Sequence, residues 1–217
     1  MYRNCQIDGR LGDNRDLKLS ILIRFAVFSF SRRCKTTLYC SKVQQSIFQC
    51  SCWGETLNGP VLAWHFDAPD VWSSLAPEDR EKRGELSTDQ CAIDNEHFFV
   101  RGLVEIPIVG SDEPFTWGVW VSLSRTNFER ARELWLDGKR VNEAAYFGWF
   151  SNSIPSYPET INLKIAVHSR DVGLRPYIEL EATDHPLALE QRNGITMVRV
   201  RQIAEQMHHH NSSMPRL

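Results

Sequence analysis

The chain has 217 residues, of which 42% are hydrophobic and 24% charged, an ordinary composition for a globular protein whose core needs neither disulfides nor metal to fold. Its net charge of −2 hides an asymmetry, because residues 1–49 hold nine Lys/Arg and three Asp/Glu while the remainder holds 16 basic and 24 acidic residues. The acidic main part argues against a nucleic-acid surface, which requires clustered Lys and Arg.

Residues 1–47 mix polar stretches with one short apolar run, Leu19 to Phe30, which Arg24 interrupts. The run is too short to span a bilayer, since a spanning helix takes about 20 apolar residues. It is also a poor signal peptide, because Arg32 and Arg33 follow it without a small-residue cleavage site. We therefore expect a disordered extension, with a peripheral amphipathic helix as the alternative.

The first elements expected after the extension are a helix and a short strand. Pro77 to Arg83 begins with proline, continues with acids and ends with bases before Gly84, which suits the dipole of a short exposed helix. Gln90 to Asp94 follows as a short strand.

The central feature is an antiparallel hairpin. One apolar face runs through alternate residues from Phe98 to Ile108, and a second runs through alternate residues from Phe115 to Leu123. Residues 110–114, Gly-Ser-Asp-Glu-Pro, form the turn between the two strands. Pro107 lacks an N–H donor, so its strand is expected at a sheet edge or bulged there. Because side chains alternate across a strand, one face of the hairpin should pack on a core.

The remaining elements follow from apolar spacing and from capping residues. In chain order they are a helix from the N-cap Ser124 to Asp137-Gly138, a strand or turn over Tyr146 to Phe150, strands over Thr160 to His168 and Pro176 to Glu181, a helix over Leu187 to Arg192, and a last helix capped by Thr196. Trp135 falls on the apolar face of its helix and is expected in the core. Interleaved hairpins and helices without a βαβ rhythm predict an α+β fold with a mainly antiparallel sheet, as a single domain over residues 48–207 followed by a disordered tail over 208–217.

The hairpin, with FDAPDVW before it and YFGW, GLRP and TDHPLALEQRNGIT after it, resembles a bacterial family known as domain of unknown function 2199. The resemblance runs from about Phe48 to about Met207. It implies a small cytoplasmic bacterial protein without an assigned activity, so it carries over no catalytic residues. Family members tend to open with a Cys-x-x-Cys-Gly element. Trp53 stands here where the second cysteine would be, so a metal site in that element would lack a ligand.

The cysteines do not form a disulfide pattern. Three of the six lie in the extension, and Cys50 and Cys52 are too close to pair with each other comfortably, so we expect reduced thiols in a cytoplasm. Cys50 and Cys52 are candidate zinc ligands with Cys91 or a histidine. Structural zinc takes four ligands, usually from two pairs, and no second pair exists. Cys91 is also explained as a small buried residue of a strand, so no metal or other cofactor is expected.

Three histidines are candidates for acid–base chemistry, because histidine titrates near neutral pH. His97, His168 and His185 could act with Asp184 and Glu105. Each histidine also has a structural explanation: the first begins a strand, the second ends one on its polar face, and the third lies at a helix start that Asp184 would cap.

The mixed face of the hairpin is the candidate binding surface. Trp120 points with Thr116 and Ser122 away from the apolar row, and Arg101 and Glu105 occupy the same face of the first strand. An amphipathic tryptophan beside an arginine is typical of recognition surfaces. The alternative is a second layer of structure that covers this face.

The sequence thus favours a non-enzymatic binding or accessory module with a protein or small-molecule partner, without nucleic acid and without a membrane span. The main reason is that no set of residues has a convincing catalytic spacing. The alternative is a small hydrolase-like or metal-assisted enzyme that uses Cys50, Cys52 and a histidine.

Overall fold

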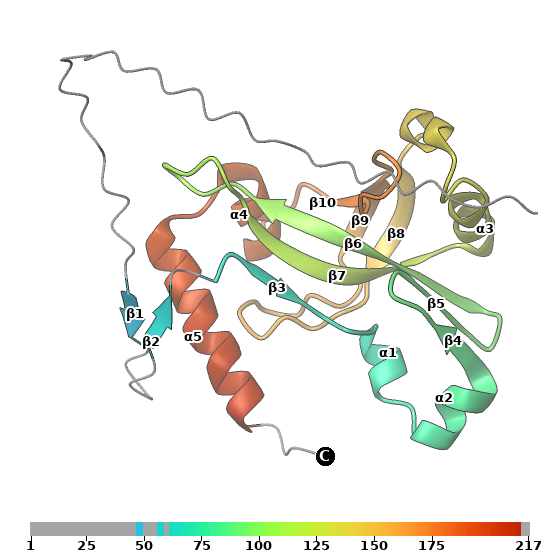
Figure 1. Ribbon diagram of the computed structural model, residues 1–217, viewed down its shortest axis with the longest axis horizontal. Coiled ribbons are helices and arrows are strands. Elements are labelled where there is room, and N and C mark those ends of the chain that lie inside the picture. The colour runs from blue at the N-terminus through green and yellow to red at the C-terminus, as the bar shows by residue number, and fades with distance from the viewer. Residues whose placement is uncertain (1–46, 50–55, 59–60, 214–217) are drawn as a thin grey trace, which may run out of the picture. The chain divides into compact units, whose positions relative to one another are not determined.

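The computed structural model describes residues 47–49, 56–58 and 61–213 (Figure 1). Apart from Ile47, the extension expected over 1–47 lies outside these residues, as do Cys50 and Cys52. The first described elements, β1 (Ile47–Gln49) and β2 (Thr56–Asn58), pair as a small antiparallel sheet.

The main sheet has eight strands. They are β3 (Ala63–His65), β4 (Gly84–Leu86), β5 (Gln90–Ile93), β6 (His97–Ile106), β7 (Phe115–Leu123), β8 (Tyr146–Phe150), β9 (Lys164–His168) and β10 (Tyr177–Leu180). β6 and β7 form the predicted hairpin, in register from Phe98 opposite Leu123 to Ile106 opposite Phe115. They run side by side through the centre of Figure 1.

The sheet is mainly antiparallel, as predicted, but it also closes on itself, which the prediction of an antiparallel sheet did not include. Strands β7, β8, β9, β10 and β6 pair in a ring, so five strands form a closed barrel, while β3 extends it at β7 and β5 and β4 extend it at β6. Closure uses a parallel pairing between β10 and β6, and β3 is also parallel to β7. Alternation along a strand shows which face is apolar, but it does not show which distant strand completes a ring.

The helices are α1 (Asp70–Ser73), α2 (Pro77–Arg83), α3 (Arg125–Glu133), α4 (Pro186–Asn193) and α5 (Met197–Ser213), with a 3₁₀ helix η1 (Gly138–Asn142). As predicted, Ser124 caps α3, its Oγ accepting a hydrogen bond from the Asn127 N–H at 3.2 Å. The cap of α4 is His185, whose Nδ1 accepts from the Leu187 N–H at 3.2 Å, and not Asp184 as expected.

The last helix continues beyond Met207 to Ser213, into the segment expected to be a disordered tail. Among the described residues, no helix combines the length and apolar character that crossing a bilayer requires.

The apolar rows of the hairpin face the barrel interior, as the alternation predicted. Val104, Trp117 and Val119 are fully buried there with residues from the other barrel strands. α4 and α5 add Leu187 and Ile203 to the same core. The interior is therefore filled by side chains.

A second, smaller core lies on the outer face of the hairpin. Phe99 and Trp120 pack there with Cys91 and Ile93 of β5, with Ala68 just before α1 and with Trp72 of α1. The indole Nε1 of Trp120 donates to the Phe66 carbonyl oxygen at 3.0 Å, so even the polar end of this side chain is bonded within the protein.

Gly148 and Gly138 provide a matched test of the barrel packing. A Cβ at position 148 of β8 would collide with the Ser122 carbonyl oxygen of β7, whereas a Cβ at position 138 would meet nothing within 4 Å. We expect Gly148→Ala to destabilise the protein by roughly 1–3 kcal/mol or more, because backbone atoms of paired strands cannot move apart freely. Gly138→Ala should be neutral or stabilise by up to about 1 kcal/mol. Denaturant unfolding measures the change in stability for both variants. Equal changes would contradict the close contact between β7 and β8 at position 148.

Candidate functional site

The structure confirms the predicted pairing on the outer face but buries its tryptophan. Arg101 lies opposite Trp120 and Glu105 opposite Thr116. The side chain of Trp120 is 0% exposed, because the segment before α1 covers it. The expectation that Trp120 borders an open surface is therefore wrong, and the alternative of a second core layer describes it.

Glu105 and Arg101 have separate surroundings. Glu105 Oε1 pairs with Arg170 Nη2 at 2.6 Å, and the Arg170 guanidinium lies 5.3 Å from the centre of the Tyr177 ring. Arg101 is only 8% exposed, and its guanidinium lies 5.9 Å from the centre of the Trp120 ring. The two predicted binding residues thus share a strand face without sharing a partner.

Arg101 supports the turn between β4 and β5. Its Nη1 donates to the Thr88 carbonyl oxygen at 3.4 Å, and its backbone N–H donates to the Asp89 carbonyl oxygen at 2.9 Å. Burial lowers the pKa of the Arg101 guanidinium, and the charge of nearby Arg175 lowers it further, while Asp67 and Asp89 act in the opposite direction. The turn therefore rests on a buried cation.

The turn, residues Ser87 to Gln90, is also locked from within. The Ser87 N–H donates to the Gln90 carbonyl oxygen at 2.8 Å, and the Ser87 Oγ accepts from the Gln90 N–H at 3.0 Å. Asp89 is tied outward, because its Oδ1 accepts from Arg175 Nε at 2.6 Å. These contacts hold the turn in one conformation.

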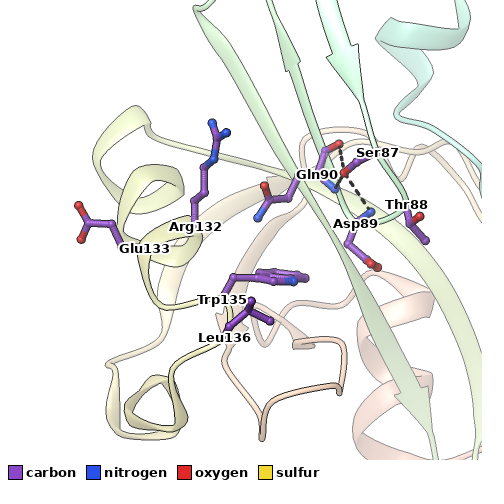
Figure 2. A pocket seen from close by; sticks show the side chains of 8 residues that line it. All are labelled: Ser87, Thr88, Asp89, Gln90, Arg132, Glu133, Trp135 and Leu136. Carbon is purple, nitrogen blue, oxygen red and sulfur yellow. Dashed lines mark hydrogen bonds between the residues drawn. The ribbon is translucent and has the colours of Figure 1, made fainter. Parts of the chain in front are cut away.

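A hollow of roughly 460 Å³ separates this turn from the end of α3 (Figure 2). Its lining combines hydrogen-bonding, charged and apolar side chains. They are Ser87, Thr88, Asp89, Gln90, Arg132, Glu133, Trp135 and Leu136. In Figure 2 the indole of Trp135 extends from the end of α3 toward the turn, and the side chain of Gln90 points back toward Arg132.

Trp135 is held in place from behind. Its carbonyl oxygen accepts from Arg140 Nη1 at 2.9 Å, and the Arg140 guanidinium lies 4.8 Å from the centre of its ring. Arg140 is 3% exposed, so this support is itself fixed. Within the described part of the chain, the guanidinium of Arg132 and the side-chain amide of Gln90 make no hydrogen bond or ion pair. The ring of Trp135 is thus held beside two polar side chains, Arg132 and Gln90, whose hydrogen-bonding groups are free to bind a ligand.

In two further hollows, the Asp, Glu, Lys and Arg side chains of the lining are already engaged. In one of about 500 Å³, the carboxylate of Asp70 accepts from Asn152 at 3.0 Å and from the Ser153 N–H at 2.7 Å. In another of about 530 Å³, Lys164 and Glu179 are ion-paired with neighbours at 3.5 Å and 2.7 Å. The hollow beside α3 is therefore the candidate site.

The predicted acid–base histidines do not come together. His168 Nε2 lies 2.7 Å from Glu179 Oε2, His185 caps α4, and His97 is exposed at the start of β6. Within the described residues, no group of three or more His, Cys, Asp or Glu side chains is placed to hold a metal ion. Low zinc content stays a prediction, because Cys50 and Cys52 lie outside those residues.

A family described as an uncharacterized protein conserved in bacteria (DUF2199) matches residues 49–195. The chain belongs to this family. The resemblance expected from the hairpin and its flanking motifs is confirmed, although the match ends before α5. Both walls of the hollow and Arg101 lie inside the matched part. Comparison with curated proteins and with solved structures gave no match.

Sequence reasoning missed the site because it assigned Trp135 to the core. The signal that could have revealed it is the apolar triplet Leu134, Trp135 and Leu136 at the end of a helix. Neighbouring residues point in different directions on a helix, so an apolar triplet on a helix with one polar face places at least one member outside the apolar face. In the structure Leu134 is 8% exposed and Leu136 is 82% exposed, with Trp135 between these extremes.

Truncation of Trp120 tests the second core layer. We expect Trp120→Ala to cost roughly 3–5 kcal/mol, the usual loss for a buried aromatic residue. Trp149→Ala is the matched control, because Trp149 lies on the neighbouring β8 and is 38% exposed, and it should cost about 1 kcal/mol or less. Denaturant unfolding compares the two, and a small loss for Trp120→Ala would contradict its burial.

Cys91 tests the same layer chemically. Burial raises the pKa of its thiol to about 12, so at pH 8 the thiol stays protonated and is a poor nucleophile. Iodoacetamide should leave Cys91 unmodified in the native protein and alkylate it after unfolding. Peptide mass mapping follows this residue separately from the other cysteines. Rapid native alkylation would show that the layer opens.

Proposed function

We propose that this protein is a non-enzymatic binding module whose ligand site is the hollow between the Ser87–Gln90 turn and the end of α3. The observation that carries the proposal is the pairing of a fixed indole, Trp135, with the unengaged side chains of Arg132 and Gln90. Aromatic rings supply contact area at low entropic cost, and side chains with bonds to offer give orientation and specificity.

The chemistry of the lining favours binding over catalysis. The carboxylate of Asp89 is already engaged, because its Oδ1 accepts a hydrogen bond from Arg175 Nε at 2.6 Å. Ser87 uses its hydroxyl group within the turn. The alternative of a hydrolase-like or metal-assisted enzyme rests on Cys50 and Cys52, and no observation in the described part of the chain favours it.

The hollow suits a small molecule or a single protruding side chain. Its volume of roughly 460 Å³ falls within the range of about 300–1,000 Å³ usual for small-ligand pockets. A flat or apolar part of the ligand would lie against Trp135 and Leu136, with hydrogen-bond acceptors directed to Arg132 and Gln90. The cytoplasm remains the proposed setting, because the cysteine pattern favours reduced thiols.

A fragment screen by protein NMR tests this proposal. A library of heteroaromatic acids and monosaccharides is titrated into ¹⁵N-labelled protein, and we expect amide shifts that centre on residues 87–90 and 132–136. Trp135→Ala should weaken any such hit by at least about tenfold, because it removes the stacking surface. Arg132→Gln should weaken acidic hits by about tenfold, because it removes a charge-assisted hydrogen bond.

Trp149→Ala is the control, since it removes an indole from a different surface and should leave affinities unchanged. Hits that retain full affinity in Trp135→Ala, or a screen whose shifts map elsewhere, would contradict the proposed site.

A further inference from the structure

Three arginines and two acids lie along one edge of the barrel, and their charges do not balance. Arg170 pairs with Glu105 and Arg175 pairs with Asp89, each at 2.6 Å. Arg101, the most deeply buried of the three arginines, has no carboxylate within 4.0 Å among the described residues. One positive charge is therefore left without a counter-ion where the solvent has been largely removed.

The polar atoms of Arg101 show the same deficit. Its Nε–H is buried and has no hydrogen-bond acceptor, and its one side-chain hydrogen bond is the 3.4 Å contact of Nη1 with the Thr88 carbonyl oxygen. A guanidinium carries five N–H donors and keeps its charge in proteins. Buried charges in native proteins are paired, because an isolated ion loses its hydration without compensation.

Arg140 shows that burial alone does not create this deficit. It is also almost fully buried, but Trp135 provides both a carbonyl acceptor at 2.9 Å and a ring 4.8 Å away. No buried polar atom of Arg140 lacks a partner. The missing acceptor is a particular property of Arg101.

The position of Arg101 in the sheet explains why it lacks an acceptor from a neighbouring strand. β6 changes neighbours at this point: the Arg101 N–H donates to the Asp89 carbonyl oxygen before β5, and the Leu103 N–H donates to the Pro176 carbonyl oxygen before β10. Arg101 thus stands at the seam between two strands that meet β6 along the same edge. Asp67 is the nearest further acid that influences it, but its side chain is 95% exposed and lies 3.7 Å from His65.

We infer that Arg101, with Arg175 beside it, binds the anionic group of a ligand, a carboxylate or a phosphate. The planar guanidinium fork matches both groups in a bidentate arrangement, and its Nε–H is a donor that such a group would satisfy. The Trp120 ring lies near the same guanidinium and limits its orientation, so the donor is positioned before the ligand arrives. The two sites share the Ser87–Gln90 turn, which Arg101 supports, so the Arg101 Nε–H resonance, and not a loss of affinity alone, tells an anion at Arg101 from a ligand in the hollow beside α3.

Titration of the full chain with inorganic phosphate and, separately, with acetate tests the inference. Sodium chloride keeps the ionic strength constant, so that screening effects cancel. We expect saturable binding of at least one anion by calorimetry, and a shift of the Arg101 Nε–H resonance in the NMR spectrum of the arginine side chains. Arg101→Lys identifies that resonance by removing it. The anion that binds more tightly distinguishes a phosphate site from a carboxylate site.

Arg101→Gln should reduce the affinity for that anion by about tenfold or more, because it removes a charge-assisted hydrogen bond. Arg125→Gln is the matched control, because its guanidinium already donates to Asn95 Oδ1 at 3.1 Å and belongs to neither proposed site, so it should keep the affinity of the original chain. The NMR titration uses the original chain and depends only on Arg101→Lys, which keeps the positive charge, for assignment, so it decides the matter even if Arg101→Gln does not fold. An unmoved Arg101 resonance at saturation, no saturable binding, or unchanged affinity in Arg101→Gln would overturn the inference.

Discussion

The side chain of Asn152 connects the two layers of this protein. Its Oδ1 accepts from the Trp120 N–H at 2.7 Å, and its Nδ2 donates to the Ala68 carbonyl oxygen at 2.9 Å. The Asn152 carbonyl oxygen in turn accepts from the Thr160 hydroxyl at 2.6 Å. One buried amide therefore joins β7, the segment before α1 and the loop between β8 and β9. Because these groups are removed from water, each bond is costly to lose, and the outer layer is held over Trp120.

The outer layer determines which side chains on the outer face of the hairpin are covered by apolar residues. It covers Phe99 and Trp120 completely or nearly so, while Arg101, itself only 8% exposed, lies outside the apolar cluster. The closed barrel brings β10 to that seam, and Gly102 permits this approach, because a Cβ there would meet the side chain of Ile178. The charged edge of Arg170, Arg175 and their acids thus follows from barrel closure.

The two proposed sites share a physical basis. In the hollow beside α3, Trp135 is positioned by Arg140 while Arg132 and Gln90 have hydrogen bonds to offer. At the seam, Arg101 is positioned near Trp120 and lacks an acceptor for Nε–H. In both places the fold holds an aromatic side chain in position and leaves nearby hydrogen-bond donors without an acceptor. Such an arrangement favours recognition, because the ordering cost is met before a ligand binds.

Local patterns in the sequence determined most of the elements. Alternation identified β6, β7, β9 and β10, and capping residues identified the starts of α3 and α5, because these features depend on near neighbours in the chain. The family followed from the hairpin and its flanking motifs. Arg101 was singled out correctly as a residue of the mixed face, opposite Trp120.

The tertiary structure alone decided what surrounds those residues. Trp120, expected on an open face, is fully buried, and Trp135, expected in the core, is only partly buried beside the hollow. Parity and helical spacing tell which way a side chain points but not whether another segment lies there. The ring closure through β10, the charge balance along its edge and the missing acceptor of Arg101 all arise from contacts between distant parts of the chain. Such contacts leave no periodic signal in the sequence, because they depend on how the elements pack and not on the spacing within any one of them.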